Sequence, residues 1–230
     1  MFVGKYERTA KNKKEESEVY EEYKKEIVEY GRKILNSNHV VGTSGNISVR
    51  IGNTSLFAIT PSGMPYEELT VDDIPIIDVK GERIEGTKKP SIEVRMHGLI
   101  YEHYPDVRAI VHTHSVYTTV LSLIRKPLPI INETMVMVGD VPVAEFARTG
   151  SLELAENVTK ALKGRRAVIL ANHGLLCVGK SLKESFALCE EIERDAQIYV
   201  LALSTGMSVH IIPEEEAKKT REWLSKNYGQ

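Results

Sequence analysis

Apolar and polar positions recur along this chain with two periods, one typical of helices and the other typical of strands. Between residues 15 and 36, apolar side chains return every three or four positions among charged ones, which predicts an amphipathic helix. The same spacing predicts helices over residues 90–104, 116–124, 151–163, 181–204 and 213–228. Short apolar runs predict strands at residues 47–51, 55–59, 76–79, 83–85, 109–111, 135–138, 141–144, 167–170, 175–178 and 209–212.

The predicted helices and strands are interspersed, and neither an internal repeat nor a low-complexity linker divides the chain. We therefore expect an α/β protein in which residues 15–230 form a single domain after a charged, flexible segment at residues 1–14. The length of 230 residues, with 42% hydrophobic and 27% charged residues, fits one such globular domain.

The charge and cysteine content argue against several classes of partner. A net charge of −2 provides no electrostatic footprint for nucleic acid or for an anionic membrane. The two cysteines, Cys177 and Cys189, are too few for a disulfide framework, and their spacing matches no metal knuckle. No segment resembles a signal-peptide core or a membrane span, so we expect a cytoplasmic protein.

His112 and His114 are the first candidates for chemistry. They follow the apolar run 109–111, which reads as a buried strand, and alternate residues of a strand point to the same face. Two imidazoles side by side at a strand end would supply half of a zinc site, which takes about four ligands. Taken alone, the pair also fits two ordinary histidines at a polar strand end, so further ligands must come from elsewhere.

Two turns rich in glycine, serine and threonine flank the predicted hairpin. The first spans residues 42–46, before the strand at 47–51, and the second spans residues 60–63, after the return strand at 55–59. Backbone N–H groups and hydroxyls from two such turns can converge on an anion. Either turn alone also fits an ordinary loop that binds no ligand.

Two further segments offer polar groups next to regular structure. Ser91 is placed as the N-cap of the helix at 90–104. Glu93 is either an ordinary first-turn carboxylate or one that faces a metal while the helix start holds a phosphate. His173 repeats the first pattern, because it follows a buried run and precedes Gly174, which lets the backbone come close.

Five segments together resemble the class II aldolase and adducin-head family, most closely its L-fuculose-1-phosphate aldolases. They are residues 42–50, 59–63, 90–93, 112–114 and 172–174, in the family's order and at its spacing. The resemblance extends over nearly the whole chain after the first 15 or so residues. It implies a three-layer α/β/α fold with a largely antiparallel central sheet, and a four-fold symmetric homotetramer with active sites between subunits.

The resemblance also implies what the site residues do. His112, His114 and His173 would bind Zn²⁺ or another divalent ion, and Glu93 would be a mobile fourth ligand that becomes the catalytic base. The phosphate of dihydroxyacetone phosphate would lie among Thr43, Gly45, Asn46, Ser62, Gly63 and Ser91. Tyr228 matches a tail tyrosine that donates a proton at a neighbouring subunit, and its alternative is a helix-end aromatic in a flexible tail.

The implied reaction is reversible cleavage of a ketose 1-phosphate, such as L-fuculose 1-phosphate, into dihydroxyacetone phosphate and a lactaldehyde-like aldehyde. Zinc as a Lewis acid suits it, because proton removal next to a carbonyl creates negative charge. Two positions depart from the family pattern. Ile92 replaces a serine of the phosphate site, and one hydroxyl is worth only about 0.5–1.5 kcal/mol. Glu133 replaces a tyrosine near the aldehyde, which suggests a different aldehyde or proton relay.

Three alternatives to the aldolase interpretation remain open. A methylthioribulose-1-phosphate dehydratase keeps the three histidines but places its acid/base glutamate later in the chain, where Glu133 could serve. Against this alternative, the dehydratase lacks the segment that this chain has at residues 90–93. A pentulose-5-phosphate 4-epimerase carries an aspartate where this chain has Glu93. An adducin-like head would be a non-enzymatic interaction module, but such heads lack the histidines that are present here.

Overall fold

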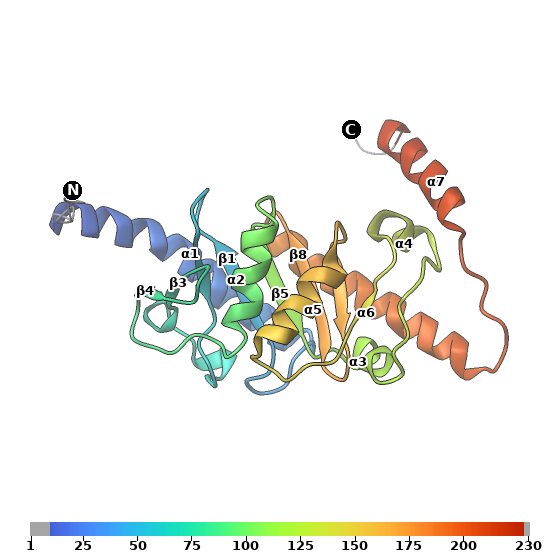
Figure 1. The fold of residues 1–230 in the computed structure, drawn as a ribbon, viewed down its shortest axis with the longest axis horizontal. Helices are drawn as coiled ribbons and strands as arrows, with labels where there is room; N and C mark the ends of the chain where they lie inside the picture. Colours follow the sequence, from blue (N-terminus) through green and yellow to red (C-terminus); the bar gives the residue numbers. More distant parts are fainter. Residues whose placement is uncertain (1–9, 228–230) are drawn as a thin grey trace.

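The computed structural model describes residues 10–227, and its centre is one eight-stranded sheet with the strand order β4-β3-β2-β1-β5-β8-β7-β6 (Figure 1). Every neighbouring pair is antiparallel except β6 and β7, which are parallel. The strands are β1 (Asn46–Arg50), β2 (Leu56–Ile59), β3 (Ile76–Asp78), β4 (Arg83–Glu85), β5 (Ala109–Thr113), β6 (Val143–Ala144), β7 (Ala167–Leu170) and β8 (Gly174–Gly179). The prediction of an α/β fold with a largely antiparallel sheet is confirmed.

Helices cover both faces of the sheet. They are α1 (Ala10–Asn36), α2 (Val94–His103), α3 (Val116–Leu123), α4 (Glu133–Val138), α5 (Leu152–Leu162), α6 (Leu182–Ser204) and α7 (Glu214–Asn227), with short 3₁₀ turns at Tyr66–Glu68 and Val71–Asp73. Two separate apolar clusters form the core: α1, α3 and α6 pack on one face, and α2 and α5 pack on the other. In Figure 1, α2 and α5 lie in front of the sheet.

Strand β5 shows how the sequence divides its side chains between these two clusters. Ala109 and Val111 join the cluster under α1 and α6, whereas Ile110 joins the cluster under α2 and α5. Because alternate strand residues share a face, His112 lies on the α2 side with Ile110. The same alternation places the polar residues of β1 on the α2 side, since Ile47 and Val49 belong to the other cluster.

Several element predictions are confirmed, including the helices expected at residues 151–163 and 181–204, and each of these has a serine N-cap. Ser151 Oγ accepts a hydrogen bond from Leu154 N at 3.1 Å, and Ser181 Oγ accepts one from Glu184 N at 3.2 Å. Helix α2 begins later than expected, at Val94, and its N-cap position is Glu93 rather than Ser91. Ser91 Oγ nevertheless accepts from Glu93 N at 3.3 Å, so the side chain still serves the helix start.

Two element predictions are wrong, and one helix starts earlier than expected. Residues 135–138 form helix α4 rather than a strand, because Asn132 Oδ1 accepts from Met135 N at 3.0 Å and caps a helical turn. Residues 209–212 form no strand, since Ile212 N donates to Ile130 O at 2.8 Å in a loop away from the sheet. The first helix starts at Ala10 rather than at the expected residue 15; its lysines and glutamates are good helix formers.

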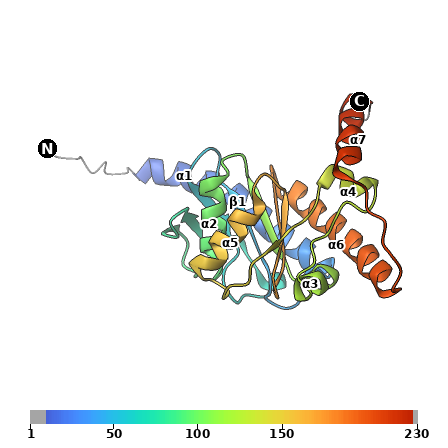
Figure 2. The ribbon, with the colours of Figure 1, turned by 45° about the vertical axis from the view of Figure 1, so that its right-hand side comes forward.

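Helix α7 projects away from the sheet and packs mainly on α4 (Figures 1 and 2). Arg221 Nη1 donates to Val136 O at 2.9 Å, and Ala217 is buried. No helix within residues 10–227 is long and apolar enough to span a membrane. Tyr228 and most of the segment 1–14 lie outside the described residues.

Candidate active site

Three histidines from two strand ends converge on one point. His112 is the penultimate residue of β5 and His114 follows the strand, while His173 lies in the turn between β7 and β8. The His112 Nε2 atom is 3.1 Å from His114 Nε2 and 3.3 Å from His173 Nε2. The ligand atoms of all three lie within 4.8 Å of one another, which is the spacing expected around one shared metal ion.

The surroundings of these rings favour neutral imidazoles, the form that binds metal. Burial lowers the pKa of His112 well below its usual value, and the neighbouring His173 and His114 lower it further. Burial and His173 also lower the pKa of His114. His112 Nδ1 lies 2.9 Å from Leu175 O, so Nδ1 carries the proton and the Nε2 lone pair points toward the other two rings.

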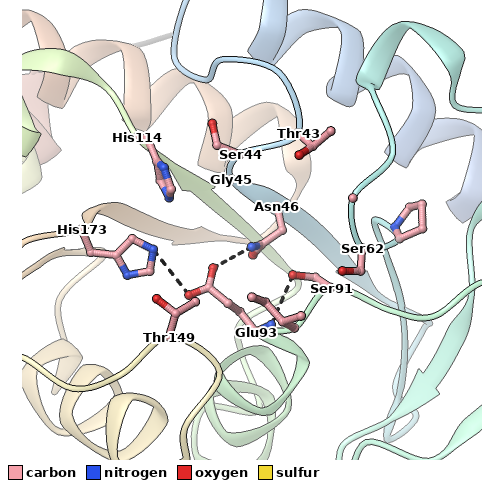
Figure 3. Close-up of a pocket in the computed structure, with 13 residues that line it drawn as sticks. Thr43, Ser44, Gly45, Asn46, Ser62, Ser91, Glu93, His114, Thr149 and His173 are labelled. Carbon is pink, nitrogen blue, oxygen red and sulfur yellow. Dashed lines mark hydrogen bonds and ion pairs between the residues drawn. The ribbon is translucent and has the colours of Figure 1, made fainter.

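The Glu93 carboxylate lies beside the histidines. Its Oε2 atom is 3.3 Å from His112 Nε2, and its Oε1 atom is 3.6 Å from His173 Nε2 (Figure 3). Glu93 is only 3% exposed, and Oε1 has no hydrogen-bond partner. A buried carboxylate oxygen without a partner is costly, and a cation between Glu93 and the imidazoles would satisfy it. The donor set of three imidazoles and a carboxylate therefore fits a zinc-type ion.

His114, His173 and Glu93 border a polar cavity of about 360 Å³. All six residues expected to hold a phosphate line it, and these are Thr43, Gly45, Asn46, Ser62, Gly63 and Ser91. The second turn reaches the start of α2 because Ser62 N donates to Lys89 O at 2.9 Å and Ser91 N donates to Thr60 O at 3.0 Å. The structure thus brings together two turns and a helix start that are separate in the sequence.

Two glycines allow the close backbone approach on which the site depends. Gly45 has a φ of +73°, and an added Cβ would lie 2.7 Å from His112 O. At Gly174 an added Cβ would lie 2.1 Å from Thr113 O, which would push the β7–β8 turn and His173 away from β5. The expectation that Gly174 permits close approach is confirmed.

Thr149 lines the cavity and was not found by sequence reasoning. Its side chain points toward Glu93 from the loop before α5 (Figure 3). Gly150 holds this loop against the start of α2, because an added Cβ would meet Ile92 O at 2.9 Å. Nothing in the residues around Thr149 distinguishes it from an ordinary loop threonine.

A buried polar group behind the cavity was also missed. His97 Nε2 lies 2.6 Å from Asn46 Oδ1, and His97 Nδ1 lies 2.6 Å from Ser48 Oγ, which is 2.8 Å from Tyr101 OH. Glu93, His97 and Tyr101 follow one another at intervals of four residues, which places them on one face of α2. This spacing was the sequence signal that could have grouped them.

The burial of His97 predicts a pH dependence of stability. Desolvation lowers the pKa of His97 from 6.5 to about 3, so between these values the unfolded chain binds more protons than the folded one. Stability due to neutral His97 is complete above pH 6.5 and is lost as the pH falls toward about 3. The loss is about 1.4 kcal/mol per pH unit.

A His97→Gln variant lacks this loss, so urea denaturation should show its stability relative to wild type rising on acidification. A difference that does not vary with pH would contradict a neutral buried ring.

One predicted residue is not brought into this cavity. Glu133 is exposed in the first turn of α4 and does not line the cavity. A role for Glu133 would therefore need a substrate that extends beyond the cavity, or a second subunit. Tyr228 lies outside the described residues.

The chain is similar to several known proteins. The family model for the Class II Aldolase and Adducin N-terminal domain matches residues 25–200. A 5-deoxy-D-ribulose 1-phosphate aldolase from Bacillus thuringiensis serovar kurstaki is 38% identical over 208 residues, covering 90% of this chain and 97% of that protein. An L-fuculose phosphate aldolase from Escherichia coli O6:H1 is 40% identical over 190 residues, covering 82% and 86%. A solved structure of an L-fuculose 1-phosphate aldolase has a TM-score of 0.85 at 40% identity, covering 89% and 96%.

Proposed function

This chain belongs to the class II aldolase and adducin N-terminal domain family, and we propose that it is a zinc-dependent aldolase of phosphorylated sugars. It would reversibly cleave a ketose 1-phosphate into dihydroxyacetone phosphate and a small aldehyde. The observation that carries the proposal is the convergence of three imidazole Nε2 atoms beside a buried carboxylate at the edge of a polar cavity. A non-enzymatic adducin-like module would have no need of this arrangement.

The proposal includes the architecture of the family. We take residues 15–230 as one class II aldolase-type domain, which the single continuous sheet supports. Apolar clusters on both sides of that sheet support a three-layer α/β/α arrangement.

His112, His114 and His173 would hold the zinc ion, with Glu93 as a fourth ligand that can leave. When bound, the ion would supply Lewis-acid polarisation of the substrate carbonyl. Among the described residues that line the cavity, Glu93 carries the only carboxylate. We therefore assign it the role of base, removing the proton from the carbon beside the carbonyl during condensation and returning it during cleavage.

The substrate phosphate would lie in the opposite part of the cavity, between the two turns and the start of α2. Ser62 and Ser91 offer hydroxyls there, and Gly45 and Gly63 offer backbone without side chains. Ile92 also lines the cavity and is 63% exposed. It offers no hydroxyl, which supports a phosphate site with one donor fewer than the family pattern.

The identity of the aldehyde is the finer part of the proposal. Cleavage of L-fuculose 1-phosphate releases lactaldehyde, whereas cleavage of 5-deoxyribulose 1-phosphate releases acetaldehyde. An ionised carboxylate accepts hydrogen bonds, so Glu133 would favour a hydroxylated aldehyde if it meets the substrate. We therefore propose a lactaldehyde-like product.

Condensation with a panel of aldehydes tests this function. Zinc-loaded protein should join dihydroxyacetone phosphate to lactaldehyde and glycolaldehyde with a higher kcat/KM than to propionaldehyde, and Glu133→Gln should reduce the preference. Glu102→Gln, an exposed change on α2, is the matched control. Equal use of all three aldehydes would remove Glu133 from the aldehyde site. Failure to condense any aldehyde, combined with dehydration of methylthioribulose 1-phosphate, would replace the aldolase proposal by the dehydratase.

Assembly is a further part of the proposal, and we expect a homotetramer with active sites between subunits. Large apolar side chains that are more than 40% exposed lie along α3, α4, α6 and α7, which supports their burial by another subunit. They are Val116, Leu123, Met137, Ile198, Leu201 and Trp223. The projecting α7 would bring Tyr228 to a neighbouring site as a proton donor (Figure 2).

Deletion of residues 225–230 tests the role of the tail. Turnover should fall while zinc content and the tetramer remain, because the removed residues carry Tyr228 but no proposed metal ligand. Light scattering gives the assembly state, and metal analysis gives the zinc content. A wild-type monomer in light scattering, or full turnover after the deletion, would contradict a catalytic role for Tyr228.

A further inference from the structure

The polar face of β1 lies against a polar stripe on α2. The alternate β1 positions on this side are Asn46, Ser48 and Arg50, and the helix presents Glu93, His97 and Tyr101 at four-residue intervals. Two residues advance a strand by about 6.6 Å and four residues advance a helix by about 6.0 Å. The polar residues of β1 and those of α2 therefore lie opposite one another, position by position. Such a match places polar groups opposite one another along the whole contact.

The match produces a continuous chain of short contacts between buried groups. Asn46 Nδ2 donates to Glu93 Oε2 at 2.7 Å, and Asn46 Oδ1 lies 2.6 Å from His97 Nε2. Ser48 Oγ lies 2.6 Å from His97 Nδ1 and 2.8 Å from Tyr101 OH. Asn46 is 4% exposed at the cavity wall, while His97 and Ser48 are fully buried, so solvent does not compete for the contacts among Ser48, His97 and Tyr101.

The direction of each hydrogen bond in the chain follows from chemistry. The carboxylate of Glu93 accepts, so the Asn46 amide points its N–H₂ group at Glu93 and its oxygen at His97. His97 Nε2 must then carry a proton to donate to that oxygen. Burial lowers the pKa of His97 to about 3, so the ring is neutral and its Nδ1 is an acceptor.

The remaining two bonds are then determined as well. Because His97 Nδ1 accepts, the Ser48 hydroxyl donates to it, and Ser48 Oγ is left to accept from Tyr101 OH. Burial raises the pKa of Tyr101, so its hydroxyl keeps the proton that it donates. The Arg50 guanidinium lies over the Tyr101 ring, with Cζ 4.7 Å from the ring centroid, and closes the far end of the chain.

We propose that Ser48, His97 and Tyr101 are positioning residues: their one-directional hydrogen-bond chain fixes the Asn46 amide and so holds the Glu93 carboxylate beside the three histidines. An Asn46 amide with its oxygen and nitrogen positions exchanged would place the oxygen against the Glu93 carboxylate and repel it. The chain does not carry a proton from end to end, because the Asn46 amide would have to become an imidic acid to pass one on. Its effect on the chemistry is therefore the placement of Glu93. The catalytic part of the inference rests on the aldolase function proposed above.

The tautomer of His97 tests the chain without any activity. Metal-free protein labelled with ¹⁵N-histidine should show, at neutral pH, one ring with a protonated Nε2 and an unprotonated Nδ1 whose signals disappear in His97→Gln. A charged His97 ring, or one protonated at Nδ1, would overturn the proposal. This readout holds even if the protein has no aldolase activity, so the failure of the proposed function would be visible separately.

A double-mutant cycle tests whether His97 acts through Asn46. His97→Leu should lower the rate of hydrogen exchange at dihydroxyacetone phosphate about 10- to 100-fold, the usual effect of an outer-shell partner. His97→Gln should recover part of the rate, since its amide N–H can take the place of Nε2–H. In an Asn46→Ala background, His97→Leu should lower the exchange rate little further. His103→Leu, an exposed change on the same helix, is the control.

The cycle has clear contradicting outcomes. An equal loss from His97→Leu in both backgrounds would show that His97 acts independently of Asn46. No recovery in His97→Gln, with its folding and zinc content intact, would show that the Nε2–H group is not what matters. If His97→Leu fails to fold, the tautomer measurement and the His97→Gln variant still decide the proposal.

Discussion

Replacing His173 with alanine should sharply lower zinc affinity while the fold persists. His112, His114 and His173 meet with their Nε2 atoms, and removing one leaves two imidazoles and a carboxylate for a cation that takes about four ligands. Replacing a residue that hydrogen-bonds a metal ligand already lowers metal affinity about 10- to 100-fold, and loss of a ligand itself should lower it more. His173 is the suitable position because its side chain is 13% exposed, whereas the fully buried His112 is part of the core.

Metal analysis after gel filtration measures this effect. Wild type should retain about one zinc-type ion per chain. His210→Ala is the matched control, because His210 is exposed in the loop before α7. Wild-type zinc content in His173→Ala would contradict the assignment of the metal site.

Replacing Glu93 with glutamine should nearly abolish hydrogen exchange between dihydroxyacetone phosphate and solvent. Removing a general base typically lowers the rate by about 10²- to 10⁴-fold. The substitution keeps the size of the side chain, and Asn46 Nδ2 can still donate to the oxygen of the new amide. Folding and zinc binding should therefore survive, with the three histidines holding the ion.

The exchange is followed by NMR as the substrate hydrogen is replaced by deuterium from the solvent. The comparison with Glu102→Gln, which changes an exposed carboxylate on the same helix, separates the role of Glu93 from a general effect of lost charge. An unchanged exchange rate in zinc-loaded Glu93→Gln would move the base elsewhere, and Glu133 would be the next residue to test.

The histidine cluster was predictable because its cause is local. His112 and His114 follow a buried strand, and a strand places alternate side chains on one face whatever the rest of the fold does. His173 was recognised by the same pattern, a strand end followed by Gly174. The resemblance implied that His173 converges with the other two, and in the structure this convergence depends on the pairing of β5 with β8.

The wrong element assignments arose where a short apolar run carries little information. Residues 135–138 read as a strand because four apolar residues fit either a strand or a buried helix turn. The competing signal was Asn132, whose side chain caps Met135 N, together with Gly139, which ends the helix with a φ of +88°. Residues 209–212 had the composition of a strand, but they lie in the loop before α7, where Ile212 N donates to Ile130 O.

The chain of polar groups behind Asn46 could not be predicted from either segment alone. His97 reads as one more polar residue on α2, and Ser48 reads as one more polar residue on a strand. Their contact exists because the polar face of β1 is turned toward α2 rather than toward solvent. Only the division of Ile47 and Ile110 between opposite apolar clusters reveals that orientation.

The most direct measurement mixes zinc-loaded protein separately with L-fuculose 1-phosphate and 5-deoxyribulose 1-phosphate and follows the carbon skeletons by NMR. We expect dihydroxyacetone phosphate with an equal amount of lactaldehyde or acetaldehyde, and we expect a chelator to stop the reaction. A product that keeps the carbon–carbon bond and lacks one water molecule, or cleavage that continues at full rate without metal, would contradict a zinc-dependent aldolase.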